Sequence, residues 1–223
     1  YSYRIIFIPE TIGAIAYTHK NLKEIKKIDT GIIVTNVGGP GKYSYKQSFD
    51  KNHFLNNLIE RVFKSNLINY KVYPFDINGS DERQFSSIGF RINCCSIFKD
   101  KYYEYKYYHS SKDNLNFISS KNILKSINLY YKLIIEIEKI KFLKNRKPNG
   151  EVMLSKYNLY PKIGGSFTPN SKHSKELEFI KWILFLADGK QTNEQIISKL
   201  KIRKELFLRI VKKLLNKKLV VYE

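Results

Sequence analysis

The chain has 223 residues, of which 43% are hydrophobic, so it can bury the cores of one medium-sized domain and one small one. Its only cysteines, Cys94 and Cys95, are neighbours, which excludes a disulfide framework and predicts a cytoplasmic location. No apolar run approaches the roughly 20 residues of a membrane span, and the first residues lack the pattern of a signal peptide, so no membrane partner is expected.

The net charge of +20 raises the question of an anionic partner, because basic proteins often bind nucleic acid. The lysines are spread along the whole chain together with Ile, Asn and Tyr, as AT-rich codon usage would produce. Charge by itself therefore leaves a nucleic-acid partner open without predicting one. The chain also opens without a methionine and directly in an apolar run, which we interpret as the interior of a longer protein.

Strand-like runs and helical periodicity alternate along residues 1–143. Short β-branched and aromatic runs predict buried strands, and apolar residues at helical spacing predict helices, one of them with Asp50 as its N-cap. The expected strands are residues 3–8, 31–37, 70–73 and 92–98, and the expected helices are residues 11–27, with Ile12 and Ile15 inward, 50–64 and 122–141. This alternation predicts an α/β domain with a mostly parallel sheet and flanking helices.

Three polar stretches follow predicted strands, at residues 9–11, 38–45 and 76–85. In open α/β sheets the functional loops lie at the carboxyl ends of the strands. We therefore expect binding or catalytic side chains in these stretches.

A change in composition follows the α/β domain. Residues 144–172 are crowded with Pro and Gly and predict a connector with little regular structure. Residues 173–223 then carry three amphipathic helices and a terminal strand, expected at residues 176–186, 192–200, 204–218 and 219–222. Thr192 is the expected cap of the second helix. This order predicts a small winged-helix-like domain.

Glu10 directly follows the first predicted strand. A carboxylate at such a strand tip can act as a general base if its pKa is tuned. A glutamate at the start of a helix is also favoured by the helix dipole alone. The position therefore leaves both interpretations open.

Two further segments carry charged residues that suit a site. Asp81, Glu82 and Arg83 lie in a Gly-led loop that could bind a metal or a polar substrate, although a solvated surface loop is the ordinary alternative. His109 lies between aromatic residues and a polar turn, and Asp113 could orient its ring as metal-binding histidines require. A surface or core histidine fits the same spacing.

Four segments carry a resemblance to a known family. They read Phe-Ile-Pro-Glu-Thr-Ile-Gly at residues 7–13, Val-Gly and Tyr-Ser-Tyr-Lys between residues 37 and 46, Gly-Ser-Asp-Glu-Arg-Gln at 79–84, and Tyr-His-Ser-Ser-Lys-Asp-Asn-Leu at 108–115. In order and spacing they resemble bacterial zinc aminopeptidase-like proteins that are associated with polysaccharide biosynthesis and end in a winged-helix domain. The Leu-Tyr-Pro at 159–161 also matches, so the chain resembles the C-terminal part of such a protein.

The resemblance implies roles for the matching positions. Glu10 would be the general base that activates a metal-bound water, His109 would be a zinc ligand, and Asp81 would bind the metal or the substrate. Asp113 would orient His109. Substrate contacts are implied at Glu82, Arg83 and Tyr108.

The chain also departs from the related di-zinc exopeptidases. Thr11 stands where those enzymes have a second glutamate, and Thr35, Asn36 and Gly39 lie where they have an aspartate. The family's earlier His and Asp ligands do not lie in these 223 residues. Because a catalytic zinc needs about three protein ligands, we expect this chain alone to be inactive and to hold no stoichiometric zinc.

Two functions remain at this point. The first is a zinc-dependent hydrolase, active in the full-length protein, that cleaves a peptide-like or amide bond of a small substrate. The second is an inactive α/β protein that binds nucleic acid or a protein partner through its winged-helix-like end. The basic last helix fits the second function, but a solvated helix face explains it equally well. We favour the hydrolase, do not expect a nucleic-acid partner, and find a homo-oligomer compatible with both.

Overall fold

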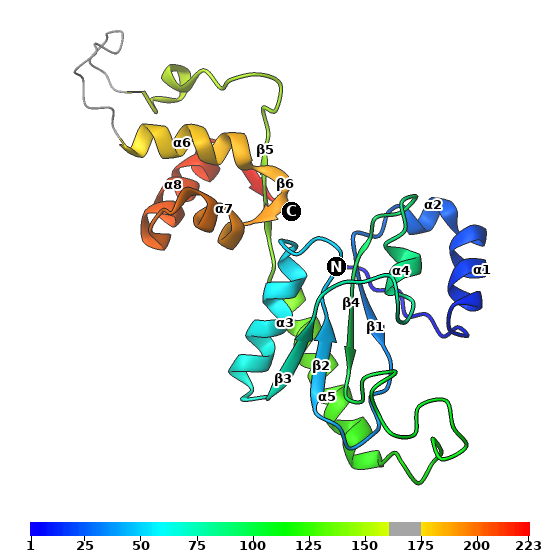
Figure 1. The fold of residues 1–223 in the computed structure, drawn as a ribbon. Helices are drawn as coiled ribbons and strands as arrows, with labels where there is room; N and C mark the ends of the chain where they lie inside the picture. The colour runs from blue at the N-terminus through cyan, green and yellow to red at the C-terminus, as the bar shows by residue number, and fades with distance from the viewer. Residues whose placement is uncertain (161–174) are drawn as a thin grey trace. The chain divides into compact units, whose positions relative to one another are not determined.

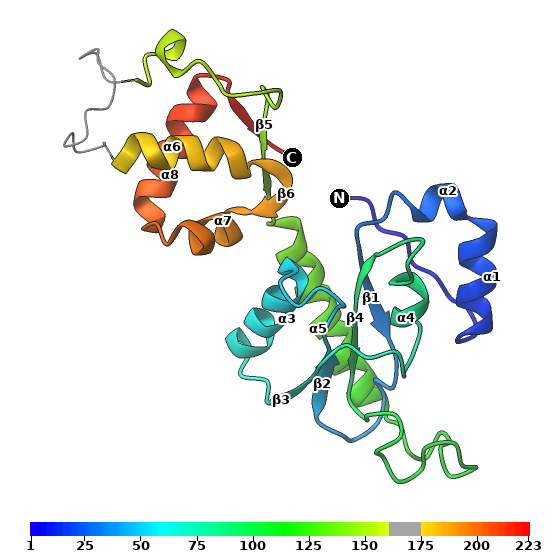
Figure 2. The same cartoon turned by 45° about the horizontal axis from the view of Figure 1, so that its top comes forward.

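The structure is a computed structural model that describes residues 1–160 and 175–223. The chain divides into two compact units, Tyr1–Lys139 and Ile140–Glu223, and each unit has a sheet of its own (Figures 1 and 2). Residues 161–174, which hold the end of the predicted connector, part of the Leu-Tyr-Pro match and the start of the predicted terminal domain, lie outside the described residues. No helix within the two described stretches is both long and apolar enough to cross a membrane.

The first unit is built on a four-stranded sheet in the order β1-β4-β2-β3. The strands are β1 (Thr30–Val34), β2 (Tyr43–Lys46), β3 (Tyr70–Tyr73) and β4 (Asn93–Phe98). β1 pairs with β4 and β2 pairs with β3 in parallel, whereas β2 and β4 run antiparallel. The predicted α/β class with a mostly parallel sheet is confirmed. β2 is a correction, because it forms within a stretch that the sequence predicted to be a loop.

Helices cover both faces of this sheet (Figures 1 and 2). They are α1 (Ile12–Lys20), α2 (Leu22–Ile25), α3 (Phe54–Ser65), α4 (Glu82–Phe85) and α5 (Ser120–Glu138). Successive residues of a strand point to opposite faces, and the two cysteines of β4 follow this rule. Cys94 packs with Ala14 and Ile25, while the Cys95 thiol donates to Asn56 Oδ1 of α3 at 3.3 Å. Both cysteines are free, as expected.

The apolar run at residues 3–8 does not form the predicted strand. It is extended, with Ile6 and Ile8 packed against the cluster around Cys94, whereas Phe7 is 95% exposed. The apolar run that predicted a buried strand is therefore only partly buried. A strand also needs a hydrogen-bonded neighbour, and within the described residues no strand pairs with this run.

Two helices begin or face differently from the prediction. α1 and α2 replace a single helix, and α1 buries Ala14 while Ile12 is 77% exposed. α3 begins after His53, whose Nδ1 accepts a hydrogen bond from the Leu55 amide at 3.4 Å, and not after Asp50. In both places a turn sets where the helix begins and which side it buries. The spacing of apolar residues, from which the helices were predicted, contains no information about that turn.

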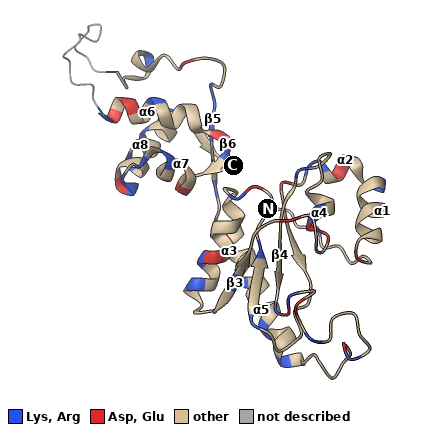
Figure 3. Ribbon diagram, in the orientation of Figure 1, with Lys and Arg blue, Asp and Glu red and all other residues tan. Residues whose placement is uncertain are grey.

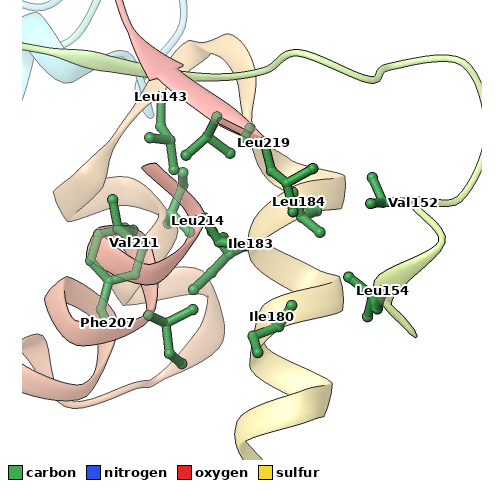
Figure 4. Close-up of a cluster of buried hydrophobic side chains, with 14 of the residues drawn as sticks. Leu143, Val152, Leu154, Ile180, Ile183, Leu184, Phe207, Val211, Leu214 and Leu219 are labelled. Carbon is green, nitrogen blue, oxygen red and sulfur yellow. The ribbon is translucent and has the colours of Figure 1, made fainter. Parts of the chain in front are cut away.

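The second unit packs three helices against a small antiparallel sheet in the order β6-β5-β7. Its elements are β5 (Phe142–Asn145), a 3-10 helix (Leu154–Tyr157), α6 (Lys175–Leu186), β6 (Asp188–Thr192), α7 (Asn193–Leu200), α8 (Lys204–Asn216) and β7 (Val220–Tyr222). Figure 4 shows the core, in which Phe207 and Leu214 of α8 meet Ile183 of α6. Val152 and Leu154 also belong to this core, so part of the predicted connector is packed structure.

The start of α7 follows from its sequence. The Thr192 hydroxyl accepts from the Gln195 amide at 3.2 Å, and the Gln195 side chain accepts from the Thr192 amide at 2.9 Å. This reciprocal pair is a capping box, which satisfies two otherwise unpaired amides.

Candidate functional site

The turn between the extended N-terminal run and α1 has an unusual backbone conformation. Thr11 has φ 60° and ψ −71°, which is rare for a β-branched residue. The Thr11 amide donates to Asp81 Oδ1 at 2.8 Å, and Arg83 Nη2 donates to the Thr11 hydroxyl at 3.4 Å. The loop at residues 79–84 thus fixes a turn that lies about 70 residues earlier in the chain.

Two carboxylates meet at this turn. Asp81 is buried, and burial raises the pKa of its carboxyl; the charges of Glu10 and Glu82 add to the increase, and the Thr11 amide opposes it. Glu10 is exposed, and its carboxylate has no hydrogen-bond partner among the described residues. The fixed turn therefore presents Glu10 to solvent beside a buried acid.

Glu82 lies in a buried ion pair with Lys46, and both residues have 0% exposure. Lys46 Nζ donates to Glu82 Oε1 at 2.9 Å, and the Ser96 hydroxyl donates to Glu82 Oε2 at 2.5 Å. The same ammonium donates to the carbonyls of Asp76 and Asn78 at 2.8 and 2.5 Å. Glu82 thus holds the loop in place. This corrects the predicted substrate contact, since both of its oxygens are used within the protein.

Tyr108 and His109 lie in a segment of turns that follows β4. Their rings stack with centroids 3.9 Å apart and an interplanar angle of 15°. His109 is exposed and has φ 54°. Burial, then Tyr103, and then the charge of Glu10 raise the pKa of Tyr108. The charge of Glu10 therefore acts on Tyr108.

Asp113 is not placed as the spacing predicted. It accepts a hydrogen bond from the Tyr105 hydroxyl at 2.5 Å, and the described residues contain no hydrogen bond between Asp113 and His109. Contact across four residues presumes helical geometry. The left-handed backbone at His109 interrupts that geometry, so Asp113 meets Tyr105 instead.

A zinc ion needs about three protein ligands. In the part of the chain that the structure describes, no three His, Cys, Asp or Glu side chains are grouped so that they could hold a metal ion. Asp81 already uses Oδ1 for the Thr11 amide, and burial raises the pKa of the Cys94 thiol, which disfavours the thiolate that binds metals. The residues present do not by themselves fit a zinc ion, and they do not bring His109 and Asp81 into such a group.

Comparison with known proteins places the chain in a family. Residues 1–140 match the family model described as a domain of unknown function, DUF4910. The chain belongs to this family. The matched residues cover nearly the same stretch as the first unit, Tyr1–Lys139, so the DUF4910 portion includes the Glu10 turn, the Asp81 loop and His109.

Two relatives of the DUF4910 chain come from Clostridium acetobutylicum. A curated candidate polysaccharide biosynthesis protein with an aminopeptidase-like domain is 33% identical over 192 residues, which are 86% of this chain and 43% of that protein. The crystal structure of a candidate peptidase is 27% identical, with a TM-score of 0.59 over 96% of this chain and 47% of that one. The predicted resemblance is thereby confirmed, and the chain spans less than half the length of these relatives.

A solved zinc aminopeptidase from Bacillus subtilis is a weaker match. Its TM-score is 0.46 at 14% identity, over 56% of this chain and 32% of that one. A likeness at this level carries no conclusion about the metal of the DUF4910 chain.

Sequence reasoning missed two residues that build the site in this DUF4910 chain. Lys46 lies within the Tyr-Ser-Tyr-Lys segment of the resemblance, but nothing local indicates that a lysine there is fully buried. Thr11 was noted as a missing carboxylate, whereas its backbone is what anchors the turn to Asp81.

Proposed function

We propose that the first unit is part of an aminopeptidase-like hydrolase that cleaves a peptide-like or other amide bond of a small substrate, with Glu10 as its proton carrier. The names of the two Clostridium relatives support this class of reaction. The observation that carries the role of Glu10 is the fixed turn, in which Asp81 binds the Thr11 amide at 2.8 Å and the Glu10 carboxylate stays exposed.

The energetics of the turn favour a catalytic role over a helix-start role. A residue in a disfavoured backbone conformation costs about 1–3 kcal/mol, and such strain is concentrated at functional sites. A hydrogen bond to a charged group contributes about 1.5–3 kcal/mol, so the bond to Asp81 can offset the strain at Thr11. Glu10 also precedes the N-cap Thr11, and the first turn of α1 contains no acidic residue. The helix-dipole explanation is weakened accordingly.

The proposed chemistry is a proton transfer at the Glu10 carboxylate. Glu10 takes a proton from the water that attacks the carbonyl carbon, and gives it to the nitrogen of the leaving amine as the C–N bond breaks. Positioned groups of this kind typically contribute about 10²–10⁴-fold in rate. Tyr108 and Arg83 are the proposed substrate contacts beside this carboxylate. We assign no step to zinc, because a zinc ion here would need ligands beyond the described residues.

The test is Glu10→Gln in the complete gene product that contains this chain. Release of the N-terminal residue from a chromogenic amino-acid anilide should fall about 100-fold or more, because glutamine cannot carry the proton. Glu24→Gln is the matched control, since Glu24 is an exposed glutamate in the same unit and its replacement should leave turnover unchanged. Normal turnover in Glu10→Gln would reduce Glu10 to a residue that merely precedes a helix.

A second proposal concerns the second unit, which we assign as a winged-helix-like module for protein packing. Glu176 of α6 supports this over nucleic-acid reading, because it forms ion pairs with Arg209 and Lys213 of α8. These pairs remove basic charge from the helix that would otherwise face DNA. Figure 3 also places Lys and Arg on many elements of the second unit and not on one stripe.

A further inference from the structure

A cavity of about 290 Å³ opens at one edge of the first unit's sheet, and none of its lining residues belongs to the Glu10 turn. It is lined by Ser44 of β2, by Tyr70, Lys71 and Tyr73 of β3, and by residues that follow β4. These segments meet because β4 runs antiparallel to β2 while β3 runs parallel to it, so the end of β4 lies beside the beginnings of the other two strands.

Four lysines line this cavity, which we call the lysine pocket: Lys42, Lys71, Lys99 and Lys101. Lys71 has a carboxylate nearby, with its Nζ 3.8 Å from Glu104 Oε2. Within the described residues, the other three lysines form no ion pair with a carboxylate. Ion pairs within the protein therefore neutralise only part of the positive charge in the lysine pocket.

The two best-buried lysines of the lysine pocket make their hydrogen bonds to carbonyl oxygens and not to carboxylates. Lys99 is 8% exposed and donates to the Gly39 carbonyl at 2.7 Å. Lys101 donates to the Tyr102 carbonyl at 3.2 Å, and its Nζ lies 3.6 Å from the centroid of the Tyr102 ring. Burial lowers the pKa of both lysines, while the charges of Asp100 on Lys99 and of Glu104 on Lys101 oppose the decrease. A bound anion would give these partly desolvated ammonium groups charge-assisted hydrogen bonds that the carbonyls do not provide.

The two acidic residues of the lysine pocket do not balance it. Glu104 accepts from the Tyr73 hydroxyl at 2.9 Å and lies beside Lys71. Asp100 accepts from the Gly41 amide at 3.1 Å, and its Oδ2 is buried without a hydrogen-bond partner. Burial raises the pKa of Asp100, while the Gly41 amide and the charge of Lys99 oppose the increase. Four ammonium groups and two carboxylates leave a formal excess of two positive charges.

We propose that the lysine pocket binds a small molecule that carries a phosphate group. A phosphate monoester has about 1.5–2 negative charges at neutral pH, which matches the excess. Lysine ammonium groups act as point charges for phosphate. Tyr70, Tyr73 and Tyr105 also line the lysine pocket, so a sugar or similar ring attached to the phosphate would have aromatic residues to pack against. This binding is independent of the hydrolase activity proposed above.

The test is calorimetric titration of the 223-residue chain with inorganic phosphate, glucose 1-phosphate and glucose at constant ionic strength. Both phosphates should bind saturably and glucose should not. The sugar phosphate should bind more tightly if the tyrosine rings contact the sugar. Lys99→Met and Lys101→Met should each weaken phosphate binding about tenfold or more, because each removes one charged hydrogen bond to the ligand.

Lys20→Met is the matched control, because it removes the same charge from an exposed site on α1. Its affinity for phosphate should stay within about twofold of the unmodified chain, since surface charges contribute little. Thermal unfolding without ligand should show that Lys99→Met and Lys101→Met are folded. Equal weakening in all three variants would identify a general ionic effect and overturn the proposal, as would the absence of saturable binding by either phosphate.

Discussion

Lys46→Met should destabilise the first unit more than its position in a four-residue strand suggests. Lys46 and Glu82 both have 0% exposure, and the ammonium also holds the carbonyls of Asp76 and Asn78. Methionine fills similar space but leaves the Glu82 carboxylate buried with Ser96 as its remaining partner. Removal of one partner from a buried ion pair costs about 3–5 kcal/mol. That is a large part of the roughly 5–15 kcal/mol that stabilises a domain.

Urea denaturation followed by far-UV circular dichroism measures this loss as a lower unfolding midpoint. Hydrogen exchange adds a local readout, because the Thr11 amide is protected by Asp81, the neighbour of Glu82. Its protection should fall in Lys46→Met before the core of the second unit is affected. The matched control is Lys64→Met, which removes an exposed ion pair with Glu60 and should barely move the midpoint.

The double variant Lys46→Met with Glu82→Leu separates the ion pair from other causes. Replacement of a buried pair by apolar residues of similar volume is often neutral. The double variant should therefore recover much of the stability that Lys46→Met loses. If Lys46→Met cost less than about 1 kcal/mol, the charge of Glu82 would have to be satisfied elsewhere and the reasoning would fail.

Further predictions concern pH, a helix cap and DNA. Burial raises the folded-state pKa of Asp81 and Asp100, so the contribution of each to stability is present below its unfolded pKa and is lost as pH rises through the folded pKa. Across that pH window, the urea midpoint of Asp100→Asn should rise relative to that of the unmodified chain. Thr192→Ala removes the capping box of α7 and should cost about 1 kcal/mol in the same assay. The second unit should show no tight, salt-sensitive binding to duplex DNA in fluorescence anisotropy, and a steep salt dependence would contradict the packing role.

The sequence predicted those elements whose own residues carry a clear local pattern. β3 lies at the predicted residues 70–73, and the Thr192 cap needs only Gln195 three residues later. The run at residues 3–8 had the apolar, β-branched composition of a strand, but strand formation depends on a neighbour that its own residues do not specify. The local pattern of residues thus predicted the conformation of a segment better than it predicted which strand the segment pairs with.

The site was harder to predict because its defining contacts are distant in sequence. Glu82 read as an exposed charge in a polar loop, yet Lys46, 36 residues earlier, makes its burial possible. Asp81 reaches the Thr11 amide across 70 residues. The Asp113–His109 contact failed for the opposite reason, since it assumed that local spacing would persist through a series of turns. Charged residues in loops are the ones whose environment a single sequence specifies least.

The buried Lys46–Glu82 pair lies near residues of both sites proposed for the first unit, because Glu82 follows Asp81 in the chain and the pair surrounds Gly79 together with the Tyr102 hydroxyl. Burial, and then nearby charges that include Glu82 and Glu10, raise the pKa of Tyr102, and Lys101 of the lysine pocket packs against the Tyr102 ring. Desolvating such a pair is unfavourable unless its geometry is well satisfied. Here the Lys46 ammonium holds Glu82, and Asp81, the residue before Glu82, binds the Thr11 amide. The Lys46→Met variant therefore discriminates between two arrangements. If this variant loses hydrogen-exchange protection at the Thr11 amide but retains phosphate binding, then β3 and the end of β4 are sufficient to maintain the lysine pocket. If both are lost, the pair is the common support that holds the Glu10 turn and the lysine pocket in their observed geometry.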